Sequence, residues 1–175
     1  MTPEHDDGRR GVLLAGAAAR GAVAGLVGVA AMTLAEKVEQ RFTGRPSSYV
    51  PARTLRVLLG RSPELDDRAP VWNHAMHWGT GAVLGTLRGV WSVVGIRGVS
   101  ATVAHSVVRL ATDQTLENAT GVGAPPARWP RGELVVDVAH KALYAAVAGL
   151  VSDRIVGPRL MGRYGDETGT AAGQR

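Results

Sequence analysis

The amino-acid sequence predicts an all-α fold, a four-helix integral membrane bundle whose helices pack through small residues of the GxxxG type. Four apolar segments of helical length and a high content of glycine, 23 of 175 residues, are the main observations. Hydrophobic residues make up 45% and charged residues 20% of the chain, which excludes a disordered, solvating protein. Cysteine is absent, which excludes a disulfide scaffold, zinc fingers and thiol catalysis.

The first predicted helix covers residues 11–42. Its apolar part, Gly11 to Ala35, contains one charged residue, Arg20, and as a helix it can cross hydrocarbon about 30 Å thick. Residues 1–10 are polar and are predicted to be a disordered tail. A cleaved signal peptide is not expected, because no small-residue cleavage site followed by a soluble domain is seen. The predicted membrane domain covers residues 11–156.

A basic linker over residues 43–70 joins the first two long helices. Pro51 suits the first turn of a short helix over 51–59, which Gly60 would end. The second long helix is predicted over 71–96. Tryptophans near its two ends are typical of a segment that spans a membrane between two interfaces. They are Trp72, Trp78 and Trp91.

The third helix, predicted over 99–119, is the least apolar of the four. Its second half carries Arg109, Asp113 and Glu117, so that half is expected to face protein or water. A turn rich in glycine and proline leads to the fourth helix, over 133–156. The remaining residues, 157–175, are predicted to be a second disordered tail.

Small residues recur at spacings of four in three of the predicted helices. Glycine inside a soluble helix costs about 1 kcal/mol relative to alanine, whereas in lipid small residues let two helix backbones approach closely. The pattern therefore favours membrane packing. No segment has 18 consecutive uncharged residues, so a soluble basic helical bundle stays as an alternative. The predicted packing positions are Gly21, Gly25, Gly81, Gly85, Gly89, Ala145 and Gly149.

Ionisable side chains inside the predicted helices form a candidate polar seam. Such groups are costly in lipid and normally face the bundle interior in pairs. His105, Arg109 and Asp113 share one helix face, because they are spaced four residues apart. The seam is interpreted either as a structural element or as a proton or ion path. Its members are Glu36, His74, His77, His105, Arg109, Asp113, Asp137 and His140.

The sequence predicts neither a metal site nor a cofactor. Histidines and carboxylates lie on several predicted helices, but the paired Glu-x-x-His motif of di-iron bundles is missing. A P-loop, a GxGxxG turn, HExxH and GxSxG are missing too, so no catalytic residue is assigned and an enzyme is not expected.

The expected partner is the lipid bilayer. The net charge of +5 comes from arginines scattered at helix ends and in the first linker, without interleaved aromatics, so nucleic acid is not expected. Anionic lipid headgroups explain these arginines more simply. Lys and Arg are spread almost evenly over both sides, which leaves the orientation open. A second copy of the chain or another membrane protein also remains open as a partner.

Four stretches carry a family resemblance: RGAVAGLVGVAAMTL, TGRPSS, NHAMHWGTGAVLG and DVAHKALYAAVAG. Together they resemble the small, mainly actinobacterial membrane proteins of the DUF1440-like (YagU-type) kind, over roughly Gly21 to Val156. The resemblance implies a multi-pass protein of the inner (plasma) membrane with unassigned function and transfers no catalytic residue. The expected function is that of a structural or accessory membrane protein, and the alternative is a small transporter or proton- or ion-conducting protein that uses the polar seam.

Overall fold

The computed structural model describes residues 3–158, and over this range the fold is all-helical, as predicted. The described part contains five α-helices, one short 3₁₀ turn and no strand. The elements are α1 (Pro3–Thr43), α2 (Val50–Leu58), α3 (Ala69–Val93), α4 (Gly98–Ala119), η1 (Pro126–Arg128) and α5 (Arg131–Ile155).

Helix α1 begins at Pro3 rather than at residue 11, so residues 3–10 are helical and not the predicted tail, while residues 1–2 lie outside the described part. Proline is well tolerated at the start of a helix, because the first amides have no partner within the helix. The predicted tail over 157–175 lies outside the described residues from 159 onward.

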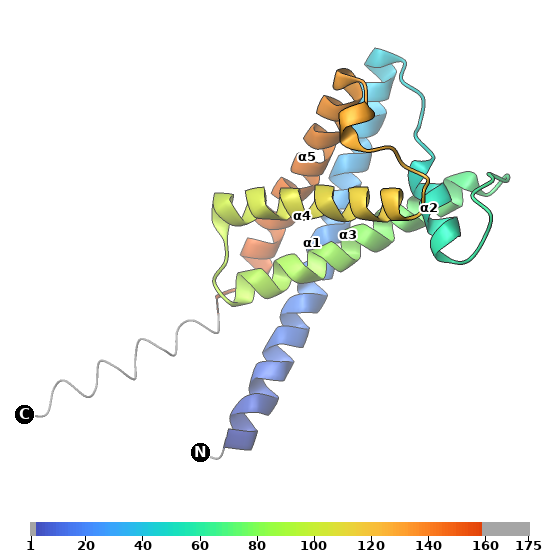
Figure 1. The fold of residues 1–175 in the computed structure, drawn as a ribbon. Helices are drawn as coiled ribbons and strands as arrows, with labels where there is room; N and C mark the ends of the chain where they lie inside the picture. Colours follow the sequence, from blue (N-terminus) through green and yellow to red (C-terminus); the bar gives the residue numbers. More distant parts are fainter. Residues whose placement is uncertain (1–2, 159–175) are drawn as a thin grey trace, which may run out of the picture.

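Helices α1 and α5 run alongside each other in opposite directions, and α3 and α4 cross them (Figure 1). The short helix α2 packs on the first part of α3. Ala52 of α2 is fully buried, and its backbone N–H donates to the side-chain oxygen of Asn73 at 3.2 Å. These contacts hold α2 against α3.

The α1–α3 contact is made by the two backbones themselves. A Cβ atom on Gly21 would lie 2.3 Å from the carbonyl oxygen of Gly85, and one on Gly25 would lie 2.2 Å from that of Gly81. From the other helix, a Cβ on Gly89 would lie 2.2 Å from the Ala17 carbonyl oxygen. No side chain larger than hydrogen fits at these positions without moving a helix.

An apolar core forms where α5 joins this pair. Tyr144 and Ala145 of α5 are fully buried and pack against Val29 of α1 and Leu84 of α3. Further along α5, Gly149 leaves room for neighbouring polar side chains, because a Cβ there would lie 2.8 Å from the Thr102 hydroxyl.

Two helices in the described part are long and apolar enough to cross a membrane, over Gly8–Thr43 and Arg131–Ile155. Helices α3 and α4 do not reach that level, so the expected four membrane-spanning helices reduce to two candidates. In α3 the apolar run is interrupted by histidines and Arg88, and α4 carries three charged side chains in its second half. Only 33% and 28% of the most apolar stretches of the two candidates are buried inside the protein.

Large apolar side chains also point outward from α1. Val23, Val27, Leu34 and Val38 are exposed, with 54%, 42%, 66% and 50% of their surfaces accessible. Their spacing of four, seven and four residues places them on one face of the helix. Helix α1 therefore has a glycine face toward α3 and an apolar face toward the surroundings.

Candidate functional site

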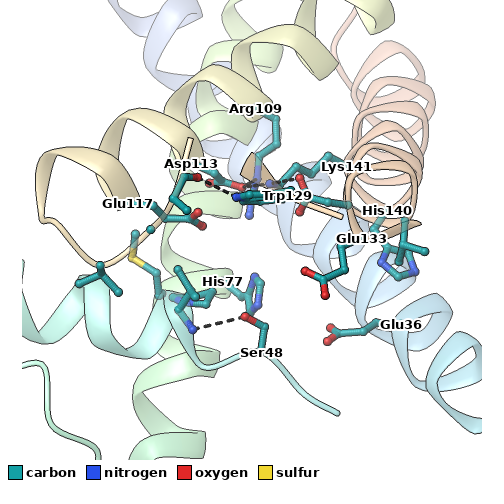
Figure 2. Close-up of a pocket in the computed structure, with 18 of the residues that line it drawn as sticks. Glu36, Ser48, His77, Arg109, Asp113, Glu117, Trp129, Glu133, His140 and Lys141 are labelled. Atoms are coloured by element: carbon teal, nitrogen blue, oxygen red, sulfur yellow. Dashed lines mark hydrogen bonds and ion pairs between the residues drawn. The ribbon is translucent and has the colours of Figure 1, made fainter. Parts of the chain in front are cut away.

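A charged cavity of about 450 Å³ lies at one end of the bundle. All four long helices contribute to its walls, together with the segments around residues 45–51 and 122–130. Figure 2 shows acidic and basic side chains from different helices pointing into it. Six of the eight predicted seam residues line this cavity: Glu36, His77, Arg109, Asp113, Asp137 and His140.

An ion-pair chain joins α4 to α5 along one wall of the cavity. Arg109 Nε donates to Asp113 Oδ2 at 3.0 Å, and Lys141 Nζ lies 3.5 Å from the same oxygen. Lys141 also donates to Asp137 Oδ2 at 2.7 Å. The arginine and the lysine are only 1% and 6% exposed, so their charges require these carboxylates as partners. Two cations and two anions balance within this chain.

Arg109 retains one unused donor. Its guanidinium carbon lies 4.8 Å from the centre of the Tyr144 ring, a cation–π contact, and the Tyr144 hydroxyl donates to the Gly81 carbonyl at 2.7 Å. Arg109 Nη1 is buried and has no hydrogen-bond acceptor among the described residues. A buried donor without an acceptor costs about 1–3 kcal/mol, so an oxygen atom placed there would be favourable.

The opposite side of the cavity is acidic. Glu36 accepts a hydrogen bond from Gln40 at 3.0 Å and makes no ion pair within 4 Å in residues 8–158, although Arg45 interacts with it electrostatically at longer range. Glu133 has no hydrogen bond or ion pair within the same range. Figure 2 shows both carboxylates, with His140 beside them, on the side away from Arg109. The neighbouring Arg45 is bound by Glu39, at 2.9 Å and 3.2 Å.

Burial changes the protonation of two groups on the helices that are not candidate spans. It raises the pKa of Glu117 to about 7, with Asp113 and Asp137 acting in the same direction and Lys141 opposing them. Burial also lowers the pKa of His77, and the charge of Arg109 adds to this. Near neutral pH the Glu117 carboxyl is therefore partly protonated, and His77 favours its neutral form.

His74 and His105, the other two seam residues, do not line the cavity. His74 is exposed on α3. His105 is fully buried between the rings of Trp91 and Tyr144, and its Nε2 donates to the Leu84 carbonyl at 3.1 Å. Burial lowers the pKa of His105 to about 4, so the ring is neutral and holds α4 against α3.

A second polar cluster, not predicted from the sequence, lies toward the other end of α3 and α5. Arg88 is fully buried, and its Nη2 donates to Asp153 Oδ2 at 2.9 Å. Asp153 also accepts from the Ser92 hydroxyl at 2.8 Å and from the Gly98 backbone amide at 3.0 Å. Asp153 follows Arg88 by 65 residues, so no local spacing could have indicated the pair.

Several cavity residues were also missed by the sequence analysis. Lys141 follows Asp137 by four residues, a spacing typical of helical ion pairs, and could have been recognised from it. Arg45, Trp129 and Glu133 lie in loops or at a helix start, where no periodic pattern marks them. Trp129 is held in the loop before α5 by donating to the Ala124 carbonyl at 2.7 Å.

Neither a metal-binding group in the described part of the chain nor a similar known protein indicates what the cavity binds. Within the described residues, no group of three His, Asp or Glu side chains is arranged to hold a metal ion. No protein-family model, no curated protein and no solved structure matches this chain, so the family resemblance stays a prediction.

Proposed function

We propose that this chain is a multi-pass protein of the plasma membrane, anchored by α1 and α5, with an accessory role based on binding rather than catalysis. The apolar outer face of α1 is the observation that carries the proposal. Soluble monomers rarely leave a continuous apolar face open to water. A core helix of a soluble protein would be mostly buried, whereas about a third of the most apolar part of α1 is buried.

The position of the charged cavity agrees with this arrangement. Helix α1 ends at the cavity and α5 begins there, so the cavity lies at the same end of both candidate spans. In a bilayer this end would be at the level of the lipid headgroups. Arg41, Arg128 and Arg131 occur near the same helix ends, where they suit anionic headgroups.

An apolar layer supports binding over conduction. Along α3 and α5 the cavity residues come first, the core residues Leu84 and Tyr144 follow, and Arg88 and Asp153 lie beyond. The two polar clusters are therefore separated by packed apolar side chains, with the buried His105 ring beside them. A proton or ion path would need polar groups or water through that layer.

Cysteine labelling tests the membrane proposal, because the chain contains no natural cysteine. Val23 in α1 and Leu59 after α2 are almost equally exposed, at 54% and 56%. With the protein in lipid nanodiscs, which leave both membrane faces accessible, a water-soluble maleimide should label Leu59→Cys at least ten times faster than Val23→Cys. Equal rates, or extraction of the protein from native membranes by alkaline carbonate without detergent, would contradict the proposal.

A further inference from the structure

We propose that the charged cavity binds a zwitterion, a ligand with an anionic oxygen group at one end and a primary ammonium group at the other. This inference deepens the proposed binding role and rests on it. Two features on opposite sides of the cavity support it: an unused donor on Arg109, and the carboxylates of Glu36 and Glu133, which make no direct ion pair in the described residues.

The anionic end of the ligand is assigned to Arg109. The Arg109 side chain is 99% buried, and Asp113, Lys141 and Asp137 complete a neutral chain with it. Nη1 of Arg109 is the part of this chain that lacks an acceptor. A carboxylate or phosphate oxygen would supply one, and charge-assisted hydrogen bonds of this type are among the stronger ones in proteins. Figure 2 shows the Arg109 side chain directed from α4 toward the middle of the cavity.

The ammonium end is assigned to Glu36 and Glu133. Neither carboxylate has an ion pair in the described part of the chain, although both face the cavity. A simple anion would gain the Arg109 contact but would be repelled by these two carboxylates. A simple cation would leave the Arg109 donor unused. A zwitterion satisfies both sides, and a primary ammonium has three N–H groups to share between the carboxylates.

The cavity volume and the apolar part of its wall define the size class of the ligand. A volume of about 450 Å³ is in the range of small-molecule sites. Met32, Met76 and Pro51 add apolar surface beside the charged groups. Phosphoethanolamine has this chemistry, and it occurs both as a free molecule and as the headgroup of phosphatidylethanolamine.

Binding to purified protein in detergent distinguishes these two sources. Free phosphoethanolamine would be titrated by calorimetry, and phosphatidylethanolamine and phosphatidylglycerol of equal chain length would be compared by native mass spectrometry. We expect the ethanolamine lipid to bind at least ten times more tightly than the glycerol lipid, which has no ammonium group. Binding of phosphoethanolamine as well would identify the headgroup alone as sufficient, and binding of the lipid only would identify the lipid as the ligand.

Glu133→Gln is the informative variant, because Glu133 is exposed and its carboxylate makes no hydrogen bond or ion pair in residues 8–158. It should fold normally and weaken binding of the ethanolamine ligand at least ten-fold. Glu64→Gln, in an exposed loop away from the cavity, is the matched control and should bind like the wild type. The inference is overturned if neither ethanolamine ligand binds, if both lipids bind equally, or if Glu133→Gln binds like the wild type. None of these results would alter the labelling rates of Val23→Cys and Leu59→Cys.

Discussion

The buried arginines of this protein are neutralised by carboxylates, one within the same helix and one on a distant helix. Arg109 is paired with Asp113 one turn away, whereas Arg88 on α3 depends on Asp153 of α5. Removing one partner of a buried pair is costly, because the remaining charge stays in a medium of low polarity. Replacing both partners by uncharged groups costs much less.

Asp153→Asn should therefore destabilise the protein by about 3 kcal/mol or more. The amide keeps the shape of the side chain but leaves the Arg88 guanidinium without a counter-ion. Adding Arg88→Met to this variant should recover most of the loss in thermal unfolding followed by circular dichroism in detergent. Asp67→Asn, in an exposed loop, serves as the control and should melt like the wild type. A double variant less stable than Asp153→Asn would show that Arg88 contributes otherwise than through this pair.

Glu117 predicts a pH dependence of stability. Its pKa rises from 4.5 in the unfolded chain to about 7 in the folded one, so the folded state holds the proton more tightly. The stability that Glu117 contributes is complete below pH 4.5 and is lost as the pH rises through 7. Glu117→Gln stays neutral throughout, so its melting temperature relative to wild type should be higher at pH 8 than at pH 5. Parallel curves for variant and wild type would contradict the assignment, and Glu64→Gln should give such parallel curves.

The four-residue spacing indicated which polar residues share a helix face, but not which contacts their side chains make. Arg109 and Asp113 share a helix face and both line the cavity, as four-residue spacing favours. His105 has the same spacing, yet it lies one turn further into the apolar layer and bonds to the backbone instead. Glu133 and Arg45 could not be found in this way, because a loop or a helix end has no repeating pattern. The Arg88–Asp153 pair depends on how α3 and α5 cross, which the sequence does not state.

The contact between α1 and α3 depends on the absence of side chains. Gly21 and Gly25 of α1 face Gly81, Gly85 and Gly89 of α3 at distances where only hydrogen fits. In lipid, close packing of this kind stabilises helix pairs through van der Waals contact. Gly11 and Gly16 of α1 and Gly79 of α3 have open space around them, so position rather than residue type decides the effect of a substitution.

Gly85→Ala and Gly79→Ala should change stability in opposite directions. A Cβ on Gly85 would lie 2.4 Å from the Gly21 carbonyl oxygen, so α1 and α3 must separate. A Cβ on Gly79 of the same helix meets no atom within 4 Å. Alanine there should stabilise the helix by up to about 1 kcal/mol. Melting temperatures in detergent measure both effects, and an unchanged value for Gly85→Ala would mean that the two helices can separate without cost.

The helical character of each long segment was predictable, because length and apolar content exceed what a loop would have. The number of membrane spans was not, since α3 combines a glycine face, two histidines and Arg88 in one helix. The start of α1 was also missed: the polar composition of residues 3–10 indicated a tail, although it contains no residue that prevents helix formation. Composition was a poor guide to where this helix begins.

The molecule as a whole has charged groups at both ends of α3 and α5 and an apolar layer between them. Leu84, Tyr144, Ala145 and Ala148 form that layer together with Val29 of α1. This arrangement favours a protein without a continuous polar path between its two charged ends. The binding role and the conducting role therefore predict different proton fluxes across a membrane.

Purified protein in liposomes should give no proton flux above that of protein-free liposomes, measured with an internal pH-sensitive dye. The reason is the apolar layer, in which burial lowers the pKa of the His105 imidazole to about 4, so that this ring takes up a proton poorly near neutral pH. A proton ionophore confirms that the assay responds. Flux that disappears in His77→Ala or His140→Ala, while both variants remain folded, would instead favour the conducting alternative.

The pairing of Arg88 with Asp153 also has a consequence for how the chain is made. Asp153 is synthesised 65 residues after Arg88, which corresponds to several seconds at translation rates of about 5–20 residues per second. During that interval the residues of α1 and α3 have been synthesised, but the Arg88 guanidinium has no carboxylate from α5 to pair with. The nascent α3 must keep Arg88 in contact with water or lipid headgroups until α5 leaves the ribosome. A chain that stops before α5 would retain this unpaired charge, because Asp153 is the carboxylate that pairs with Arg88.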